Sequence, residues 1–297
     1  MIGKSRPDAV MVFGDANTTL AGAIATIKMH VPVCHVEAGL RSYDISMPEE
    51  VNRVLTDHYS QMLCAPTLEA LENLKKEGLK ESIILLSGDT MYDAILEHEE
   101  DIEKSTIVKD LGLTEKIYAT LTLHRPGNVD DTERLTRIIS AILDLTEIKV
   151  VFPVHPRTKK RLKKANLLGI LKLAPNVILT EPLSYFDMLN LMKCSAVVLT
   201  DSGGMQKEAF FLHVPCVTLR NRTEWLETIE LGSNTLVGAE KEQILAETKK
   251  VLMNEGIRRR LESLPNPFGE GKASQKIVRD LKERFYSGRL TVKSPTV

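Results

Sequence analysis

The sequence predicts an α/β fold with two doubly wound parallel-sheet domains, and two observations support this. Short runs of β-branched residues alternate with longer amphipathic segments along the chain, which is the pattern of a parallel sheet covered by helices. The length of 297 residues suggests about two domains, each able to bury its own core. We therefore expect ligands to bind where loops follow the carboxyl ends of strands, in the cleft between two facing domains.

The first half of the chain contains four predicted strands, at 9–13, 31–36, 61–64 and 83–86. Helices are predicted at 18–30, from Pro48 onward, and at 68–78. Ser87 and Gly88 then interrupt the pattern, so we place the hinge near Gly88. The expected domains are 1–88, joined by a C-terminal helix within 273–297, and 89–272.

The second half begins with a charged stretch, 97–109, which we expect to be a surface helix. Strands are predicted at 117–123, 150–152, 177–180, 196–201 and 215–219. Helices are predicted at 135–145, 241–254 and 273–285. Two more are expected: one is capped by Ser184, with Asp187 three residues later, and the other begins near Met205.

The composition excludes several classes of protein. With 39 Lys and Arg against 40 Asp and Glu, the net charge is −1, so no overall field favours nucleic acid or an acidic membrane, and any anion must be held locally. No apolar run has the roughly 18 residues of a membrane span, and no signal peptide is recognisable. The four cysteines lack zinc spacing and are interpreted as reduced core thiols. We therefore expect a cytoplasmic protein with no metal and no membrane or nucleic-acid partner.

The stretch from Ala196 to Glu208 is the centre of the chain, because it predicts a buried strand, a glycine corner and a helix start. Ser202, Gly203 and Gly204 leave backbone N–H groups and the positive end of a helix dipole facing outward. Ser202 can donate from its hydroxyl group, and Glu208 can accept from ribose hydroxyls. This is a predicted anion site, although a plain strand-to-helix turn accounts equally well for the corner alone.

Acidic residues follow the first two strands and open the next helix. These are Asp15, Glu37, Glu49 and Glu50. Asp15 by itself is most often a turn or cap residue, and the helix dipole accounts for two glutamates after Pro48. Glu37 at a strand end is harder to explain structurally, because a carboxylate there is usually half-buried.

Two basic pairs end neighbouring strands of the second half. His124 and Arg125 precede the turn Pro126-Gly127-Asn128, and His155 and Arg157 end the next strand. Beside the glycine corner, such pairs favour phosphate recognition over a structural role. No Gly-x-Gly-x-x-Gly or P-loop motif is present, which argues against dinucleotide or P-loop chemistry.

Five motifs together resemble the non-hydrolysing UDP-N-acetylglucosamine 2-epimerases almost from end to end. They are Gly14-Asp-Ala-Asn-Thr-Thr-Leu-Ala21, His35-Val-Glu-Ala-Gly-Leu-Arg-Ser42, Met47-Pro-Glu-Glu-Val-Asn-Arg53, His155-Pro-Arg-Thr158 and Thr200-Asp-Ser-Gly-Gly-Met-Gln-Lys-Glu-Ala209. The resemblance implies two Rossmann-like domains of the GT-B-like architecture, with the active site in the interdomain cleft and the last helix returning to the first domain. It implies a homodimer that needs no cofactor.

The resemblance also implies roles for particular residues. The acid/base groups correspond to Asp15, Glu37, Glu49 and His124, and UDP would be held by the Ser-Gly-Gly corner with its following glutamate and by His155. We add Arg125 and Arg157 as phosphate-binding candidates. The implied reaction removes the sugar C2 proton as the C1–O bond to UDP breaks, and then adds UDP and a proton back with the opposite C2 configuration.

The sequence departs from the family pattern at two places. Gly127 stands where the family His-Arg-x-Glu-Asn stretch has a glutamate. Family members also begin earlier, with a Gly-Thr-Arg-Pro loop and further strand–helix units, so we expect an incomplete first domain that is destabilised or aggregates unless a partner or oligomer covers it.

Three alternatives to the leading function stay open at this point. Thr223-Glu-Trp225 and Gln206-Lys207 also resemble the UDP-2,3-diacetamido-2,3-dideoxyglucuronate 2-epimerases, although Trp225 is as well explained by packing under its loop. The others are a glycosyltransferase of the same architecture, disfavoured by the clustered acids, and a truncated, non-catalytic sugar-nucleotide binder.

Overall fold

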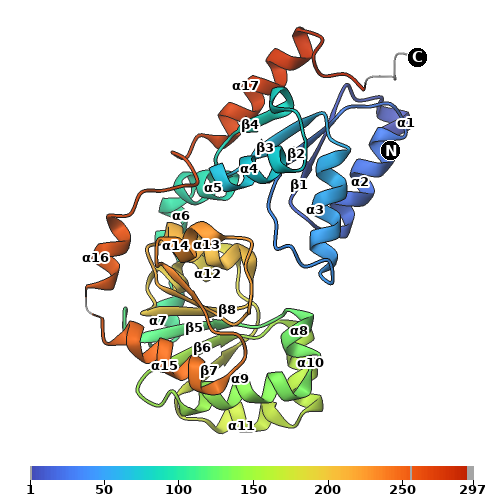
Figure 1. Cartoon of the computed structure of the whole chain (residues 1–297). Coiled ribbons are helices and arrows are strands. Elements are labelled where there is room, and N and C mark those ends of the chain that lie inside the picture. The colour runs from blue at the N-terminus through green and yellow to red at the C-terminus, as the bar shows by residue number, and fades with distance from the viewer. Residues whose placement is uncertain (1, 255, 293–297) are drawn as a thin grey trace. The chain divides into compact units, whose positions relative to one another are not determined.

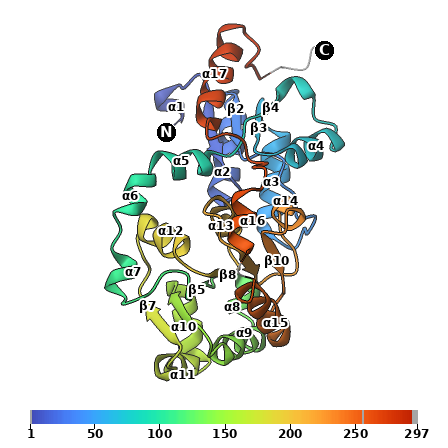
Figure 2. The ribbon, with the colours of Figure 1, turned by 90° about the vertical axis from the view of Figure 1, so that its left-hand side faces the viewer.

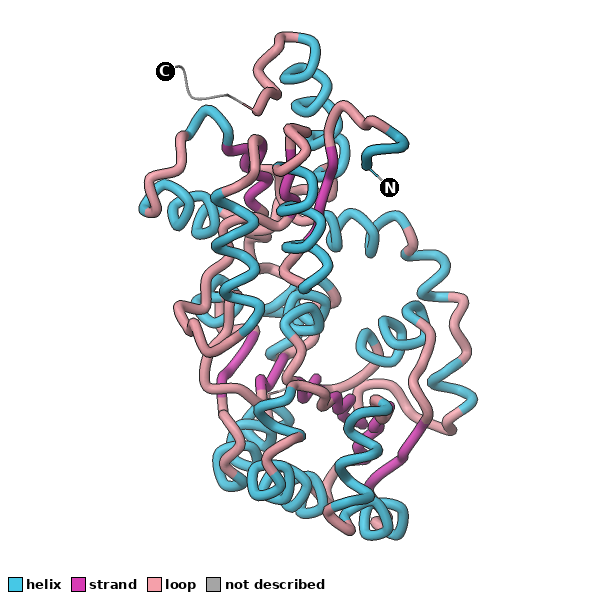
Figure 3. Tube along the Cα trace, turned by 90° about the vertical axis from the view of Figure 1, so that its right-hand side faces the viewer, coloured by secondary structure: helices cyan, strands magenta, loops and turns pink. Residues whose placement is uncertain are grey.

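The computed structural model describes residues 2–254 and 256–292 and divides into two compact units (Figure 1). Unit 1 comprises Met1–Glu97 and Asn266–Val297, and unit 2 comprises His98–Pro265. Each unit has its own parallel sheet, and Figure 3 shows the strands of both sheets in magenta. The predicted α/β class with two parallel-sheet domains is therefore confirmed.

Unit 1 has a four-stranded parallel sheet of order β1-β2-β3-β4. The strands are β1 (Val10–Phe13), β2 (Val33–Val36), β3 (Met62–Ala65) and β4 (Ile84–Leu86). The helices are α1 (Ile2–Ser5), α2 (Asn17–Ile27), α3 (Pro48–His58), α4 (Leu68–Lys76), α5 (Thr90–Glu97) and α17 (Ala273–Tyr286), with a 3₁₀ turn over Glu81–Ile83.

Helices cover both faces of the unit 1 sheet. On one face, Ala23 of α2 packs against Val12 and Val33. On the other face, Ile277 and Leu281 of α17 pack against alternate residues of β2 and β3, namely Cys34, Val36, Met62 and Cys64. The last helix therefore completes the core of the first unit; residues 293–297 of the predicted C-terminal segment lie outside the described residues.

The chain changes units after Glu97, later than the hinge expected at Gly88. The backbone N–H of Asp89 donates to the carbonyl oxygen of Phe268 at 2.8 Å, and a Cβ at Gly88 would lie 2.8 Å from the same oxygen. Gly88 has φ +85°, so glycine is favoured for this close approach. These contacts, with the packing of α5 on α17, keep 89–97 and 266–272 in unit 1.

Unit 2 has a six-stranded parallel sheet of order β10-β9-β8-β5-β6-β7. The strands are β5 (Tyr118–Thr122), β6 (Lys149–Pro153), β7 (Val177–Thr180), β8 (Val197–Thr200), β9 (Cys216–Thr218) and β10 (Asn234–Leu236). The longer helices are α9 (Thr132–Asp144), α10 (Pro156–Lys164), α12 (Tyr185–Lys193), α13 (Gly203–Phe211) and α15 (Lys241–Leu252). The shorter ones are α6 (Glu99–Glu103), α7 (Ile107–Asp110), α8 (Pro126–Val129), α11 (Leu167–Leu173), α14 (Leu226–Glu230) and α16 (Ile257–Glu262).

The two faces of the unit 2 sheet are covered by different helices. Residues of α9, α10, α11 and α15 share the larger hydrophobic cluster with β5, β6, β8 and β9. Leu191 of α12 packs with Tyr118 and Val151 on the other face, where α12 also lies beside α6 and α7 (Figure 2). Helices on both faces make this unit doubly wound.

Two details of the secondary-structure prediction were wrong. The stretch 97–109 is not one surface helix: α6 ends at Glu103, and Ser105 donates from Oγ to Asp187 Oδ1 at 2.7 Å before α7 begins. Ile102 of this stretch is buried. The helices α1, α5, α8, α10, α11, α14 and α16 and the strand β10 were not predicted. In the described part of the chain, no helix is both long enough and apolar enough to span a bilayer.

Candidate active site

Asp15 lies in the loop after β1 and is held by an arginine of α3. Its Oδ2 accepts from Arg53 Nη2 at 2.6 Å, and a third of its side chain is exposed. The residue that caps α2 is Ala16, so Asp15 does not serve as the helix cap. Its carboxylate is instead oriented by a buried guanidinium and retains access to solvent.

Glu37 follows β2 in a backbone conformation that is unusual for its residue type. Its φ is +72°, and its half-buried carboxylate lies next to the preceding loop, because a Cβ at Gly14 would be 3.1 Å from Glu37 Oε2. A left-handed non-glycine residue costs on the order of 1 to 3 kcal/mol, and such strain is concentrated at functional sites. The position therefore points to a function for Glu37.

The first turn of α3 carries two glutamates with different environments. Glu50 is buried, and its carboxylate accepts from the Ser42 N–H at 2.9 Å, the Ser42 hydroxyl at 3.0 Å, the Tyr43 N–H at 2.9 Å and Arg53 Nη1 at 2.9 Å. Glu50 thus holds the loop after β2 in place. Glu49 is only half-buried, so it is the glutamate of this pair that a ligand can reach.

A buried histidine supports the loop that carries Asp15. His35 Nδ1 lies 2.6 Å from Asp57 Oδ1, and its Nε2 lies 2.9 Å from the carbonyl oxygen of Gly14. Both neighbours are acceptors, so only the imidazolium, with two N–H donors, satisfies both. Burial opposes this charge, but Asp57 outweighs it and raises the pKa of His35.

Asp57 is the centre of this buried network. Its carboxylate also accepts from the Gly39 N–H at 3.1 Å and pairs with Arg41 Nη1 at 2.8 Å. Burial favours the neutral acid, yet His35 and Arg41 together lower the pKa of Asp57 below its usual range. The loops after β1 and β2 are therefore tied to α3 by charged groups that have no access to water.

The glycine corner of unit 2 forms as predicted. Buried β8 leads to Ser202, which caps α13 by accepting from the Met205 N–H at 3.5 Å, and the helix begins at Gly203. The Ser202 hydroxyl can still donate its own hydrogen, and Ser202 and Gly204 are half-buried. Glu208 lies one turn into the helix and is largely buried.

One side of this corner is occupied by a side chain of the same unit. A Cβ at Gly203 would lie 2.2 Å from Glu224 Oε1, and Glu224 Oε2 pairs with Arg220 Nη2 at 3.0 Å. The carboxylate lies near the positive end of the helix and is balanced by the arginine. Gly203 is therefore required for close packing against Glu224.

Asp201 organises the basic pair after β5. Its fully buried carboxylate accepts from the backbone N–H groups of His124 and Arg125, each at 3.0 Å, and from Asn128 Nδ2 at 3.2 Å. The rings of His124 and His155 are 5.8 Å apart. Burial lowers the pKa of His124, and Asp201 offsets only part of that effect. The structure thus brings both predicted histidines together, with His124 neutral at neutral pH.

Arg157 is paired within its own unit. Its guanidinium contacts the carboxylate of Asp130, which also accepts from Arg161 Nε at 2.9 Å. The Nε and Nη2 atoms of Arg157 contact Asp130, whereas its Nη1 makes no such contact. Arg125 is half-buried beside His124.

Trp225 is a packing residue. It is 2% exposed, and Lys207 Nζ lies 4.1 Å from its ring centroid. Thr223 donates from its hydroxyl to Gln206 Oε1 at 2.6 Å. The residues that suggested the second epimerase family therefore contact one another within unit 2.

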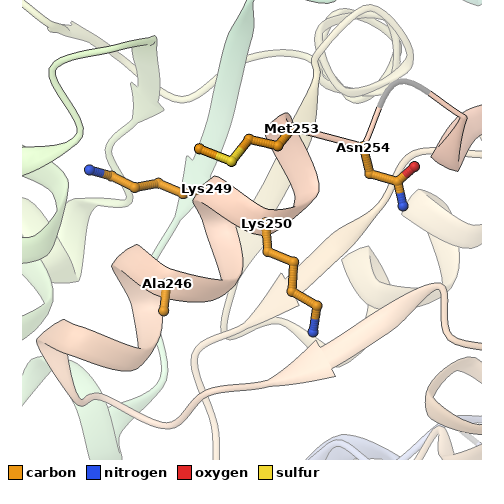
Figure 4. A pocket seen from close by; sticks show the side chains of 5 residues that line it. All are labelled: Ala246, Lys249, Lys250, Met253 and Asn254. Carbon is orange, nitrogen blue, oxygen red and sulfur yellow. The ribbon is translucent and has the colours of Figure 1, made fainter.

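Sequence reasoning missed the buried partners of the site: Arg53, Glu50 as a loop anchor, Asp57 and Asp201. Among residues 2–254 and 256–292, no group of three His, Cys, Asp or Glu side chains is placed to hold a metal. An open pocket on α15 is lined by Ala246, Lys249, Lys250, Met253 and Asn254 (Figure 4). Its lysines pair with Glu147 at 2.6 Å and Glu247 at 3.1 Å, so it offers no unbalanced charge for a phosphate.

Comparison with known proteins identifies the family of this chain. Residues 1–282 match the family model described as UDP-N-acetylglucosamine 2-epimerase. A Methanococcus maripaludis protein named as a homolog of that enzyme is 47% identical over 94% of this chain and 76% of its own length. The UDP-2,3-diacetamido-2,3-dideoxy-D-glucuronate 2-epimerase of Pseudomonas aeruginosa is 41% identical over 94% of this chain and 75% of its own length.

A solved structure gives the same result at the level of the fold. The crystal structure of Methanocaldococcus jannaschii UDP-GlcNAc 2-epimerase in complex with UDP-GlcNAc and UDP has a TM-score of 0.88 and 45% identity, over 95% of this chain and 77% of that one. The two doubly wound units thus define a protein of the GT-B-like class. More particularly, the chain belongs to the UDP-N-acetylglucosamine 2-epimerase family.

Proposed function

We propose that this protein is a non-hydrolysing UDP-N-acetylglucosamine 2-epimerase, an isomerase that interconverts UDP-N-acetylglucosamine and UDP-N-acetylmannosamine. Family membership and the M. jannaschii relative bound to UDP-GlcNAc and UDP support this substrate. Within the structure, the observation that carries the proposal is the strained Glu37 beside Gly14 and Asp15.

The sugar chemistry explains the need for several acid/base groups. C2 carries the acetamido nitrogen and is not next to a carbonyl, so its proton cannot leave to give an enolate. A base instead takes the C2 proton, the C–H electrons form the C1=C2 bond, and the C1–O electrons leave with UDP. In the reverse step UDP adds to C1 and a proton adds to C2 from the opposite face.

The residues divide between these tasks. We assign proton transfer to Asp15, Glu37 and Glu49 of unit 1 and to His124 of unit 2. Glu49 is the proposed base, because the first turn of α3 stabilises negative charge.

The departing UDP is assigned to unit 2. The proposed UDP-binding groups are Ser202, Gly203, Gly204, Glu208, His155, Arg125 and Arg157. Helix N–H groups and cations there would stabilise the diphosphate as negative charge develops.

The decisive experiment is incubation of the purified protein with UDP-N-acetylglucosamine in heavy water, with NMR detection of the sugar C2 proton. Deuterium at C2 together with the manno epimer supports the elimination and addition route. Absence of exchange despite measurable UDP binding would leave a sugar-nucleotide binder and overturn the assignment.

A matched pair of variants tests the role of Glu49. Glu49→Gln removes the proposed base and should reduce C2 exchange by at least about a hundredfold. Glu69→Gln changes an acid that, like Glu49, is half-buried and lies at the equivalent first-turn position of α4, and it should leave exchange unchanged. Near-normal exchange by Glu49→Gln would end its assignment as the base.

A second substrate is favoured by the P. aeruginosa relative. UDP-2,3-diacetamido-2,3-dideoxyglucuronate should be compared with UDP-N-acetylglucosamine in the same NMR assay. A higher kcat/KM for the glucuronate derivative would change the substrate while keeping the mechanism.

We also propose that the protein is a cytoplasmic homodimer. Val51 and Leu55 of α3 and Tyr59 at its C-cap are exposed by 42%, 37% and 50%, four residues apart, and form an apolar stripe suited to a second copy. Leu55→Glu should convert a dimer to a monomer in light scattering. The four thiols are unpaired, and alkylation in freshly lysed cells should modify all four after denaturation if the compartment is reducing.

A further inference from the structure

The segment 156–175, which forms α10 and α11, has a charge unlike that of the whole chain. It contains seven Lys and Arg and no Asp or Glu, whereas the full sequence has a net charge of −1. Arg157 and Arg161 pair with Asp130, and Lys159 pairs with Glu181. The remaining four cations have no ion pair within the described residues: Lys160, Lys163, Lys164 and Lys172.

These four lysines gather on one surface. Lys160, Lys163 and Lys164 follow helical spacing on α10, and all are exposed. Lys163 lines the same open depression as Gly169 and Lys172 of α11. In Figure 1 α10 and α11 lie close together, and they contact one another in the structure.

The outward face of α11 is apolar as well as basic. Leu167, Leu168 and Leu171 point into the core, yet Ile170 and Leu173 are 50% and 86% exposed. A helix that is apolar on both faces has more hydrophobic surface than its own fold buries. The two exposed side chains are three residues apart and are flanked by Lys172.

We propose that this surface, formed by Lys160, Lys163, Lys164, Lys172, Ile170 and Leu173, docks the protein reversibly on an anionic phospholipid membrane. Lysines attract acidic headgroups, and their long stems let the apolar side chains beside them reach the acyl boundary. Nucleic acid would satisfy the lysines but not the exposed Ile170 and Leu173, whereas a bilayer offers both acidic headgroups and an acyl region. The net charge of −1 for the whole chain does not reveal this local concentration of positive charge.

The test is cosedimentation of the full protein with vesicles of phosphatidylcholine alone or of an equal mixture of phosphatidylcholine and phosphatidylserine. Binding should require phosphatidylserine and weaken as salt is added. Each lysine should contribute about fivefold to the partition coefficient of the protein on these vesicles. Changing all four to Gln should therefore lower that coefficient at least about a hundredfold. Ile170→Gln with Leu173→Gln should lower partitioning by about tenfold.

The pocket on α15 provides the matched control. Met253 is 79% exposed and lies beside Lys249 and Lys250, as Leu173 does beside Lys172, but those lysines are paired with carboxylates (Figure 4). Lys250→Gln with Met253→Gln should therefore bind vesicles like the unmodified protein. Thermal unfolding of each variant checks that the fold is retained.

Several outcomes would overturn the proposal. These are equal binding to both kinds of vesicle, no binding to either, or unchanged binding by the four-lysine variant. Vesicle binding that is insensitive to the Ile170 and Leu173 changes, or duplex DNA binding in place of vesicle binding, would show a purely ionic surface. Because the readout is sedimentation and not turnover, its failure is distinguishable from failure of the proposed epimerase activity.

Discussion

Replacing His35 with Gln should destabilise unit 1 strongly, because the imidazolium makes two buried, charge-assisted hydrogen bonds. It donates to Asp57 and to the carbonyl oxygen of Gly14 at 2.6 and 2.9 Å, and its exposure is 0%. Hydrogen bonds to charged groups contribute roughly 1.5 to 3 kcal/mol each. Loss of both gives about 3 to 6 kcal/mol, which overlaps the cost of about 3 to 5 kcal/mol for removing one partner of a buried ion pair.

Urea unfolding of the variant and the unmodified protein would measure this effect as a lower midpoint at an unchanged slope. His58→Gln is the matched control, since His58 is 41% exposed and contacts Glu77 at 3.2 Å. That exposed pair should contribute less than about 1 kcal/mol. A His35→Gln effect no larger than that of the control would refute the imidazolium assignment.

The pH dependence of this difference has a definite sign. The folded-state pKa of His35 is raised, so its stabilisation is fully present below the unfolded pKa of about 6.5 and is lost as pH rises through the folded value. The pKa of Asp57 is lowered, so its contribution is present above about 3.9 and is lost as pH falls. The destabilisation by His35→Gln should therefore shrink in alkaline solution.

Three further predictions concern unit 2. Gly203→Ala places a Cβ 2.2 Å from Glu224 Oε1, so UDP affinity measured by calorimetry should fall at least about tenfold; unchanged affinity would exclude this corner from the UDP site. Gly127→Glu should leave the melting temperature unchanged, because nothing lies within 4 Å of its Cβ position, and it should raise kcat/KM if the family glutamate contacts substrate. Burial lowers the pKa of His124, so activity that needs its neutral form should persist below pH about 6.5 and disappear only as pH falls through the lower folded value. An acid limb that is unchanged in His124→Asn would contradict that assignment.

The sheets were predictable because buried parallel strands appear as continuous apolar runs, and nine of the ten strands lie at or within a residue or two of their expected positions. The strand that was missed, β10, has three residues at a sheet edge with one of them buried. In α10 only Thr158 and Leu162 are buried among basic residues, and α11 is apolar on both faces. α10 therefore has no repeat of large apolar residues along its buried face, and α11 has no polar face to set its apolar residues apart.

Only the solvent-accessible residues of the candidate site were predictable from the sequence. Asp15, Glu37 and His124 stand directly after strands, and this order along the chain places them at the carboxyl ends of the sheets. The buried residues that hold these positions in place come from elements distant in sequence. Asp57 pairs with His35, which supports the loop of Asp15, and Asp201 contacts His124. The pairing of Glu50 with Arg53, three residues later on α3, was not predicted, and the sequence did not show which of the two glutamates faces inward.

Arg53 has a consequence for how this protein can change. Its two terminal nitrogens contact Asp15 and Glu50, so one guanidinium supports both a proposed acid/base group and the anchor of the neighbouring loop. Substitutions at the three positions should be strongly non-additive in a double-mutant cycle. A lineage or a designer that alters the proposed sugar site at Asp15 therefore also changes the environment of the guanidinium that pairs with Glu50, so the two loops evolve together.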